Sequence, residues 1–167
     1  GMTDLENHGI YLQDSGSFEI AYNVFADIVG GNGIQINGST IVNNVCIHHN
    51  VIRDVGKHGL NLGTNSGNNI VIWNNLIYNT QYAGLRMGGT DLITNLKLYN
   101  NTFYNTGLAG NAGTGAIQNE MAAALNQVDI RNNIIWPVNS RHTSSTGTPN
   151  QTFSTNVGPL TNNLWFG

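Results

Sequence analysis

The chain of 167 residues is poor in charge and has no long apolar run. Charged residues make up only 9% of it, against roughly 25% in an average globular protein. Its six Lys and Arg residues are scattered, so they cannot form the basic surface that a nucleic-acid backbone requires, and we predict no nucleic-acid partner. No apolar segment approaches the roughly 18 residues of a membrane-spanning helix, and we predict no membrane span.

Cysteine and proline are also scarce. The single Cys46 excludes an intramolecular disulfide framework, and only 3 prolines are present. The first residues, Gly1-Met2-Thr3-Asp4, contain no basic stretch followed by an apolar segment, so we expect no signal peptide within this sequence. Histidines lack partners at the spacing of metal ligands, and we predict no metal site and no resident cofactor, with calcium as the alternative considered below.

Glycine and asparagine, by contrast, are abundant, with 21 and 28 copies. Both are unfavourable in helix interiors, and both tolerate the left-handed backbone conformation found in turns. The composition therefore predicts short strands joined by many turns.

Two sequence motifs recur along the chain with a common period. The first is an apolar residue followed three positions later by asparagine, at intervals of 27, 25, 26, 32 and 30 residues: Asn23, Asn50, Asn75, Asn101, Asn133 and Asn163. The second is Gly-apolar-x-apolar, at intervals of 24, 26, 25 and 31 residues: Gly9, Gly33, Gly59, Gly84 and a degraded copy at Gly115. Repeats of this length indicate a solenoid or an array.

Apolar residues alternate with other residues within each unit, which is typical of half-buried strands. One alternating set is expected to point inward: Val45, Ile47, Ile70, Ile72, Leu96, Leu98, Val128 and Ile130. A unit of about 25 residues with two or three short strands predicts one coil of a parallel β-solenoid. Leucine-rich repeats, propeller blades and calcium-binding nonapeptide repeats differ in motif or period.

The recurring asparagines have a structural role in this interpretation. We expect each to take the left-handed bend between two strands, with its amide bonded to the equivalent Asn in the coils above and below. Stacked coils lie about 4.8 Å apart, which suits such a ladder.

The Asn-Asn-apolar-apolar and Gly-Ile-x-Leu patterns resemble the right-handed parallel β-helix repeats of the pectate-lyase-like superfamily over roughly residues 8–139. The resemblance implies an all-β, single-stranded right-handed parallel β-helix of about five coils, located outside the cell or at its surface. It also implies a polysaccharide partner. We treat residues 1–167 as one β-helix domain, expected to be part of a longer or externally capped protein, with end-to-end self-association as a further expectation.

The outward positions of the Gly-apolar-x-apolar strands form the main candidate site. They are Tyr11, Gln35, Asn61 and Arg86, with Lys57 and His58 just before one of the glycines. Elimination on a uronate requires a group that neutralises the carboxylate and a base that removes the C5 proton. We predict Lys57, His58 and Arg86 as catalytic residues; Tyr11, Gln35 and Asn61 would bind substrate. The alternative is a solvated polar face.

Aromatic residues form further outward stripes. Trp73 and Tyr99 belong to one stripe and are predicted to stack on sugar rings, while Tyr78 and Tyr104 belong to another. The alternative is aromatic stacking between coils. A fourth stripe places Asp27 and Asp54 one coil apart, where they would bind calcium or be neutralised by Arg53.

Three functions follow from these patterns. The first is binding or processing of an extracellular polysaccharide, by a lyase-type reaction on an acidic glycan if the chain is an enzyme. The second is a non-catalytic carbohydrate-binding or adhesive segment of a larger surface protein. The third is a spacer without a ligand. The family's catalytic signatures, such as Arg-Ile-Lys or Asp-Pro-His, are missing from the sequence.

Overall fold

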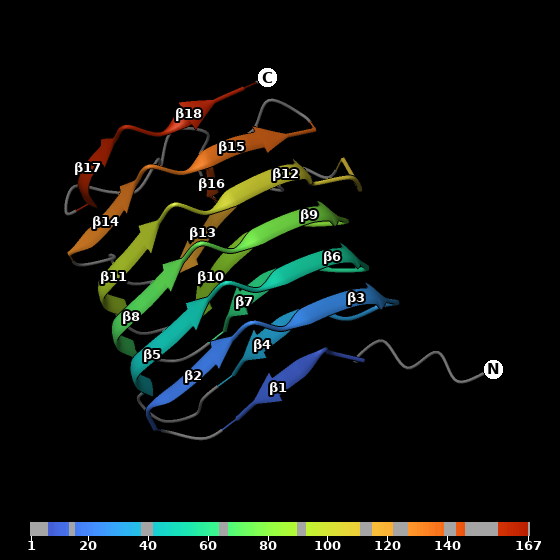
Figure 1. The fold of residues 1–167 in the computed structure, drawn as a ribbon, viewed down its shortest axis with the longest axis horizontal. Helices are drawn as coiled ribbons and strands as arrows, with labels where there is room; N and C mark the ends of the chain where they lie inside the picture. Colours follow the sequence, from blue (N-terminus) through green and yellow to red (C-terminus); the bar gives the residue numbers. More distant parts are fainter. Residues whose placement is uncertain are drawn as a thin grey trace.

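The computed structural model describes residues 7–13, 16–37, 42–63, 67–89, 93–110, 115–121, 127–138, 143–145 and 157–166. Within these ranges the secondary structure is entirely β, and no helix is long and apolar enough to cross a membrane. The chain winds through three parallel sheets, whose strands stack in successive coils from the N-terminal to the C-terminal end (Figure 1).

Each sheet has six strands, one from every coil. Sheet A contains β1 (Ile10–Leu12), β4 (Ile34–Ile36), β7 (Leu60–Leu62), β10 (Leu85–Gly89), β13 (Ile117–Met121) and β16 (Thr143–Ser145). Sheet B contains β2 (Phe18–Ala21), β5 (Val42–His48), β8 (Gly67–Trp73), β11 (Ile93–Tyr99), β14 (Val128–Arg131) and β17 (Val157–Thr161). Sheet C contains β3 (Val24–Ile28), β6 (Val51–Val55), β9 (Leu76–Thr80), β12 (Thr102–Thr106), β15 (Ile134–Pro137) and β18 (Leu164–Trp165).

This arrangement confirms the predicted all-β parallel solenoid. The glycine motif marks the start of the first four coils, Ala116 takes the glycine position in the fifth, and strands β16, β17 and β18 continue all three sheets beyond it. The predicted inward set is also confirmed, because all eight of its members are fully buried in the core between the sheets. Alternation along each strand therefore places its apolar side chains inside.

The asparagine ladder is present at the turn from sheet B to sheet C. The backbone N–H and the Nδ2 of Asn50 both donate to Oδ1 of Asn75, at 3.1 and 3.0 Å. The backbone N–H and the Nδ2 of Asn75 donate in the same way to Oδ1 of Asn101, both at 3.0 Å. Every buried amide in the row thus satisfies backbone groups of its neighbours.

One detail of the expected ladder was wrong. The left-handed residue is the one before each ladder asparagine, as at His49 and Asn74 with φ of 54° and 53°. That residue turns the chain, which leaves the following Asn free to point inward. A second, less buried ladder of left-handed asparagines connects Asn95 to Asn69 at 3.1 Å and Asn69 to Asn44 at 2.7 Å. Together the ladders account for much of the excess of asparagine.

The glycines of the second motif lie where the chain turns from sheet C into sheet A. A Cβ at Gly59 would lie 2.5 Å from Cγ2 of Ile77 and 2.7 Å from the carbonyl oxygen of Gly84, so a side chain there would collide with the next coil. The fifth coil departs from the expected alignment, since Leu85 pairs with Ile117 and Ala116 therefore takes the place of glycine. A shift of one residue reverses which side chains face outward.

Candidate functional site

A groove with a volume of about 390 Å³ lies over the outer face of sheet A, beside the turn from sheet C. Six of the predicted site residues line it: Tyr11, Gln35, Lys57, His58, Asn61 and Arg86. His8, Asn32 and Asn37 complete its described lining. The other two predicted binding residues, Trp73 and Tyr99, belong to sheet B and do not contribute to the groove.

The strand register explains why these residues meet. Tyr11 pairs with Gln35, Gln35 with Asn61, and Asn61 with Arg86 in successive strands of sheet A. In a parallel sheet the paired residues point to the same side. The predicted stripe is therefore a continuous row across β1, β4, β7 and β10.

The floor of the groove is a network of amide hydrogen bonds. Oε1 of Gln35 accepts from Nδ2 of Asn32 at 2.5 Å and from Nδ2 of Asn61 at 2.7 Å. Gln35 and Asn61 are only 7% and 8% exposed, so they are far less accessible than a solvated polar face would be. Because buried amides with satisfied hydrogen bonds are held in one orientation, the floor is preorganised.

Arg86 is held at one end of this floor. Its Nη1 donates to Oδ1 of Asn61 at 2.9 Å, and its Nε and Nη2 contact Oε2 of Glu120 at 2.6 and 2.5 Å. The other oxygen of Glu120 accepts from Nε2 of Gln118 at 2.7 Å. Sequence reasoning missed the role of Glu120 and Gln118, because the shift at Ala116 hides their register.

The absence of a side chain at Gly88 leaves room for the guanidinium of Arg86. A Cβ at Gly88 would lie 2.5 Å from Cζ of Arg86 and 2.6 Å from each Nη atom. The guanidinium therefore packs flat against the Gly88 backbone, where any side chain would displace it.

His58 is a structural residue as well as part of the groove wall. Its backbone N–H donates to Oδ1 of Asn32 at 2.8 Å, and its Nδ1 accepts from the backbone N–H of Ala83 at 3.1 Å. His8 accepts from Asn32 in the same way, at 3.1 Å. With Nδ1 acting as an acceptor, the ring proton of neutral His58 lies on Nε2.

Burial and two neighbouring positive charges keep His58 neutral. Burial, reinforced by the positive charges of Arg86 and Lys57, lowers the pKa of His58 to about 3. At neutral pH this side chain is a hydrogen-bond donor through Nε2, and its basic nitrogen is already occupied by Ala83.

Lys57 is the groove residue with an uncommitted charge. The arginines 53, 86 and 131 each form an ion pair with a carboxylate, whereas Lys57 has no such partner among the described residues. The described lining contains Lys57 and Arg86 and no carboxylate. The groove therefore offers a positive charge, several amide groups and the Tyr11 hydroxyl to a ligand.

The second stripe, on sheet B, is occupied by contacts between coils. His48 stacks on Trp73 with ring centroids 4.0 Å apart, and Arg131 lies 4.7 Å from the ring centre of Tyr99. These contacts match the stacking alternative, although Trp73 and Tyr99 remain partly exposed.

His48 also takes part in a directed hydrogen-bond chain on this surface. Its Nε2 lies 2.6 Å from Oε1 of Glu19, and its Nδ1 lies 2.9 Å from Nδ1 of His49, whose Nε2 lies 3.1 Å from Nδ2 of Asn74. An amide nitrogen donates, which fixes the direction of every bond in the chain. Asn74 donates to His49, His49 donates to His48, and His48 donates to Glu19.

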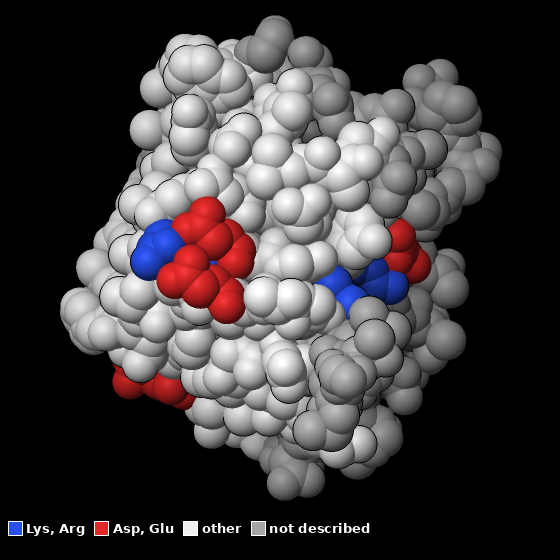
Figure 2. Space-filling model, turned by 90° about the vertical axis from the view of Figure 1, so that its right-hand side faces the viewer, with Lys and Arg blue, Asp and Glu red and all other residues white. Residues whose placement is uncertain are grey.

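The two aspartates of the fourth stripe are bridged by an arginine. Arg53 contacts Asp27 at 3.4 Å and also pairs with Asp54, as expected if Arg53 neutralises them. On the side of the molecule where the strands of sheet C end, basic side chains (blue) lie beside acidic side chains (red) in two places (Figure 2). Among the described residues, no three His, Cys, Asp or Glu side chains are grouped to hold a metal ion, and calcium binding at this stripe stays a prediction.

Comparison with known proteins agrees with this architecture. A family model described as a right-handed β-helix region matches residues 2–157, which is most of the chain. No curated protein and no solved structure gave a match. The matched span covers the motifs of the first five coils and the whole groove, so the chain belongs to the right-handed β-helix family.

Proposed function

We propose that the chain binds an acidic polysaccharide along the groove on sheet A, with a sugar carboxylate placed against Lys57 and Arg86. The observation that carries this proposal is the uncommitted charge of Lys57 beside a floor of fixed amides. Right-handed β-helices are known among proteins that bind or process polysaccharides, which supports the ligand class and a location outside the cytoplasm.

The groove suits a chain of hydroxylated rings that carry carboxylates. Its neutral side chains, such as Asn37 and Tyr11, can form hydrogen bonds with the hydroxyl groups of a sugar. Within the protein, Nδ2 of Asn37 donates to the Tyr11 hydroxyl at 3.0 Å. The row of side chains along sheet A repeats from strand to strand, so it follows the axis of the solenoid as an extended ligand would. Arg86 remains partly exposed beside Glu120, with 26% of its side chain accessible.

The geometry favours binding over catalysis as the primary role. Elimination requires a base at C5 of the uronate, and the basic nitrogen of His58 accepts from Ala83 instead. If the chain is a lyase, Lys57 acts in its neutral amine form, taking the C5 proton to become an ammonium group, and Arg86 neutralises the carboxylate. This second function is favoured by one observation, the position of an unpaired amine beside a guanidinium in one groove.

Calorimetric titration with pectate, alginate and hyaluronan tests the proposal. Lys57→Ala removes one charge-assisted contact and is expected to weaken binding roughly tenfold, about 1.4 kcal/mol. Lys97→Ala removes a lysine from sheet B and serves as the matched control, with unchanged affinity. Equal effects of the two substitutions would refute the assignment to this groove. Ultraviolet absorbance of an unsaturated product, lost in Lys57→Ala, would establish the lyase.

A further inference from the structure

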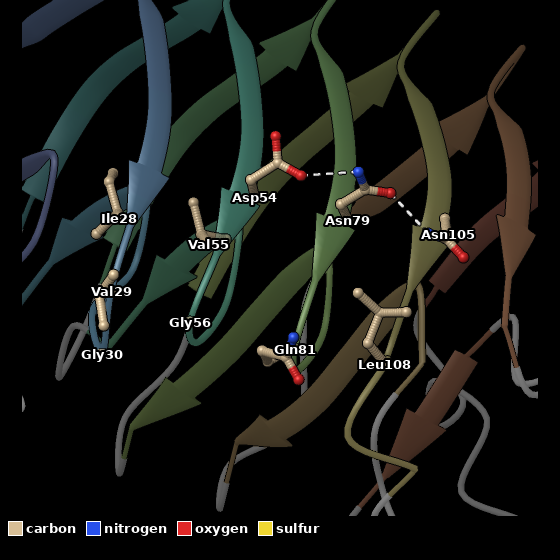
Figure 3. Close-up of a pocket in the computed structure, with 10 residues that line it drawn as sticks. All are labelled: Ile28, Val29, Gly30, Asp54, Val55, Gly56, Asn79, Gln81, Asn105 and Leu108. Carbon is tan, nitrogen blue, oxygen red and sulfur yellow. Dashed lines mark hydrogen bonds between the residues drawn. The ribbon is translucent and has the colours of Figure 1, made fainter.

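A second cavity, of about 440 Å³, lies on the other side of the turn that carries Lys57. Its walls come from the ends of β3, β6, β9 and β12 and from the residues that follow them (Figure 3). The volume lies in the range of about 300–1,000 Å³ that small-molecule sites occupy. This corner cavity shares none of its described lining residues with the groove on sheet A.

One wall of the corner cavity is a row of polar side chains. Asp54, Asn79 and Asn105 all have left-handed φ, at 53°, 53° and 51°. Nδ2 of Asn105 donates to Oδ1 of Asn79 at 2.6 Å, and Nδ2 of Asn79 donates to Oδ1 of Asp54 at 2.8 Å, so the three form one line across β6, β9 and β12 (Figure 3). Each bond uses one of the two N–H groups of a primary amide, which leaves the other for a ligand.

Apolar side chains lie beside this polar row. They belong to Ile28, Val29, Val55 and Leu108 (Figure 3). Val29 is 83% exposed and Leu108 is 39% exposed, so both present apolar surface to whatever occupies the cavity. Gln81 adds an exposed amide, which has no hydrogen-bond partner for its side chain in the described part of the chain.

The charge of the corner cavity differs from that of the groove. Hydrogen bonds from Asn79 and Arg53 lower the pKa of Asp54, so this carboxylate is ionised at neutral pH. Its charge is matched by Arg53, and the described lining contains no cation. The described lining would therefore offer an anionic ligand no cation to offset its charge beside the Asp54 carboxylate, whereas an uncharged ligand meets no such penalty.

We propose that the corner cavity binds an uncharged sugar residue. A pyranose ring has an apolar C–H face for Leu108 and hydroxyl groups for the amides of Asn79, Gln81 and Asn105, which all lie at the ends of the neighbouring strands β9 and β12. These residues are separate from those that line the acidic-glycan groove, so either assignment can fail while the other holds.

Side-chain amide signals of the ¹⁵N-labelled chain provide the test. The chain is titrated with neutral oligosaccharides of glucose, galactose, mannose and N-acetylglucosamine, each in turn. At least one series is expected to shift the Gln81 and Asn105 amides in a saturable manner. Gln81→Ala should weaken that binding about fivefold, as expected for one lost hydrogen bond. Gln13→Ala removes an exposed amide outside both cavities and should change nothing.

Three results would overturn the proposal. The first is the absence of shifts at Gln81 and Asn105 with all four series. The second is an unchanged affinity in Gln81→Ala. The third is a response of Asn79 and Asn105 to calcium chloride alone, which would make the corner a cation site. Lys57→Ala should keep the neutral-sugar response, which separates this result from failure of the acidic groove.

Discussion

The backbone N–H of Ala83 donates a 3.1 Å hydrogen bond to Nδ1 of His58, one coil away. In the preceding coil Oδ1 of Asn32 accepts from the backbone N–H of His58 at 2.8 Å. Histidine and asparagine therefore perform the same task at equivalent positions of neighbouring coils. This equivalence separates the structural role of His58 from its role in the groove.

His58→Asn is expected to keep the bond to Ala83 and to remove a pH dependence. The folded pKa of about 3 lies below the unfolded value near 6.5, so the unfolded chain takes up a proton that the folded chain cannot. His58 therefore lowers the free energy of unfolding as pH falls below about 6.5, by at most about 1.4 kcal/mol per pH unit.

Urea denaturation between pH 7.5 and about 5 measures this effect, because most carboxylates stay ionised there. His58→Asn should match the native stability at pH 7.5 and lose less stability on acidification. His58→Ala leaves the Ala83 N–H unpaired and should cost about 1–3 kcal/mol at every pH. A pH profile of His58→Asn that parallels the native one would contradict the low pKa.

The buried ladder predicts a large cost for a single amide. Asn75→Ala removes the oxygen that accepts from the backbone N–H of Asn50 and from one N–H of its Nδ2, which leaves two buried N–H bonds unpaired. We expect a loss of about 2–4 kcal/mol in the free energy of unfolding, measured by urea denaturation. Asn68→Ala, on an exposed position of the same coil, is the control and should change stability by less than about 0.5 kcal/mol. Similar losses in both variants would argue against the ladder.

Gly88→Ala tests the placement of Arg86. The added methyl group would lie against the guanidinium, whose flexible side chain can move away, so we expect displacement of Arg86 from Asn61 with little loss of stability. Affinity for pectate, alginate or hyaluronan, whichever binds, should fall nearly as far as in Arg86→Ala. Calorimetry measures both variants. Native affinity in Gly88→Ala combined with weak binding in Arg86→Ala would show that the position of the guanidinium is unimportant.

Glu120→Gln is expected to strengthen binding of the acidic glycan. Its carboxylate occupies Arg86 and offsets the charge of the groove, so its removal leaves a more positive site. A gain of roughly threefold to tenfold at low ionic strength is expected. Asp27→Asn removes another carboxylate paired with an arginine, away from the groove, and should leave affinity unchanged. Weaker binding in Glu120→Gln would mean that the ion pair supports the ligand site.

Much of the architecture was predictable because the repeat fixes register. Once Gly33 and Gly59 are aligned, Gln35 and Asn61 must be neighbours on one face, and the structure pairs them. The same reasoning predicted the inward set and the row of buried asparagines. Local patterns are sufficient here, since each coil contacts only its neighbours.

The details of the site could not be predicted for two physical reasons. The fifth coil places Ala116 where glycine was expected, so alignment on Gly115 reverses the faces and hides the outward Gln118. Side-chain direction is the second reason. Neither the hydrogen bond from Ala83 to the His58 ring nor the ion pair between Arg86 and Glu120 follows from the spacing of the repeats, because both depend on rotamers set by packing.

Recognition of a carboxylate by the groove is the central claim, and matched polymers test it most directly. Pectate, alginate and hyaluronan are each compared with a form in which the carboxylates are esterified, at low and high ionic strength. We predict that at least one acidic polymer binds, that esterification removes most of the affinity, and that added salt weakens binding. Equal affinity for the acidic and esterified polymers, or no binding of any of the three, would contradict the claim.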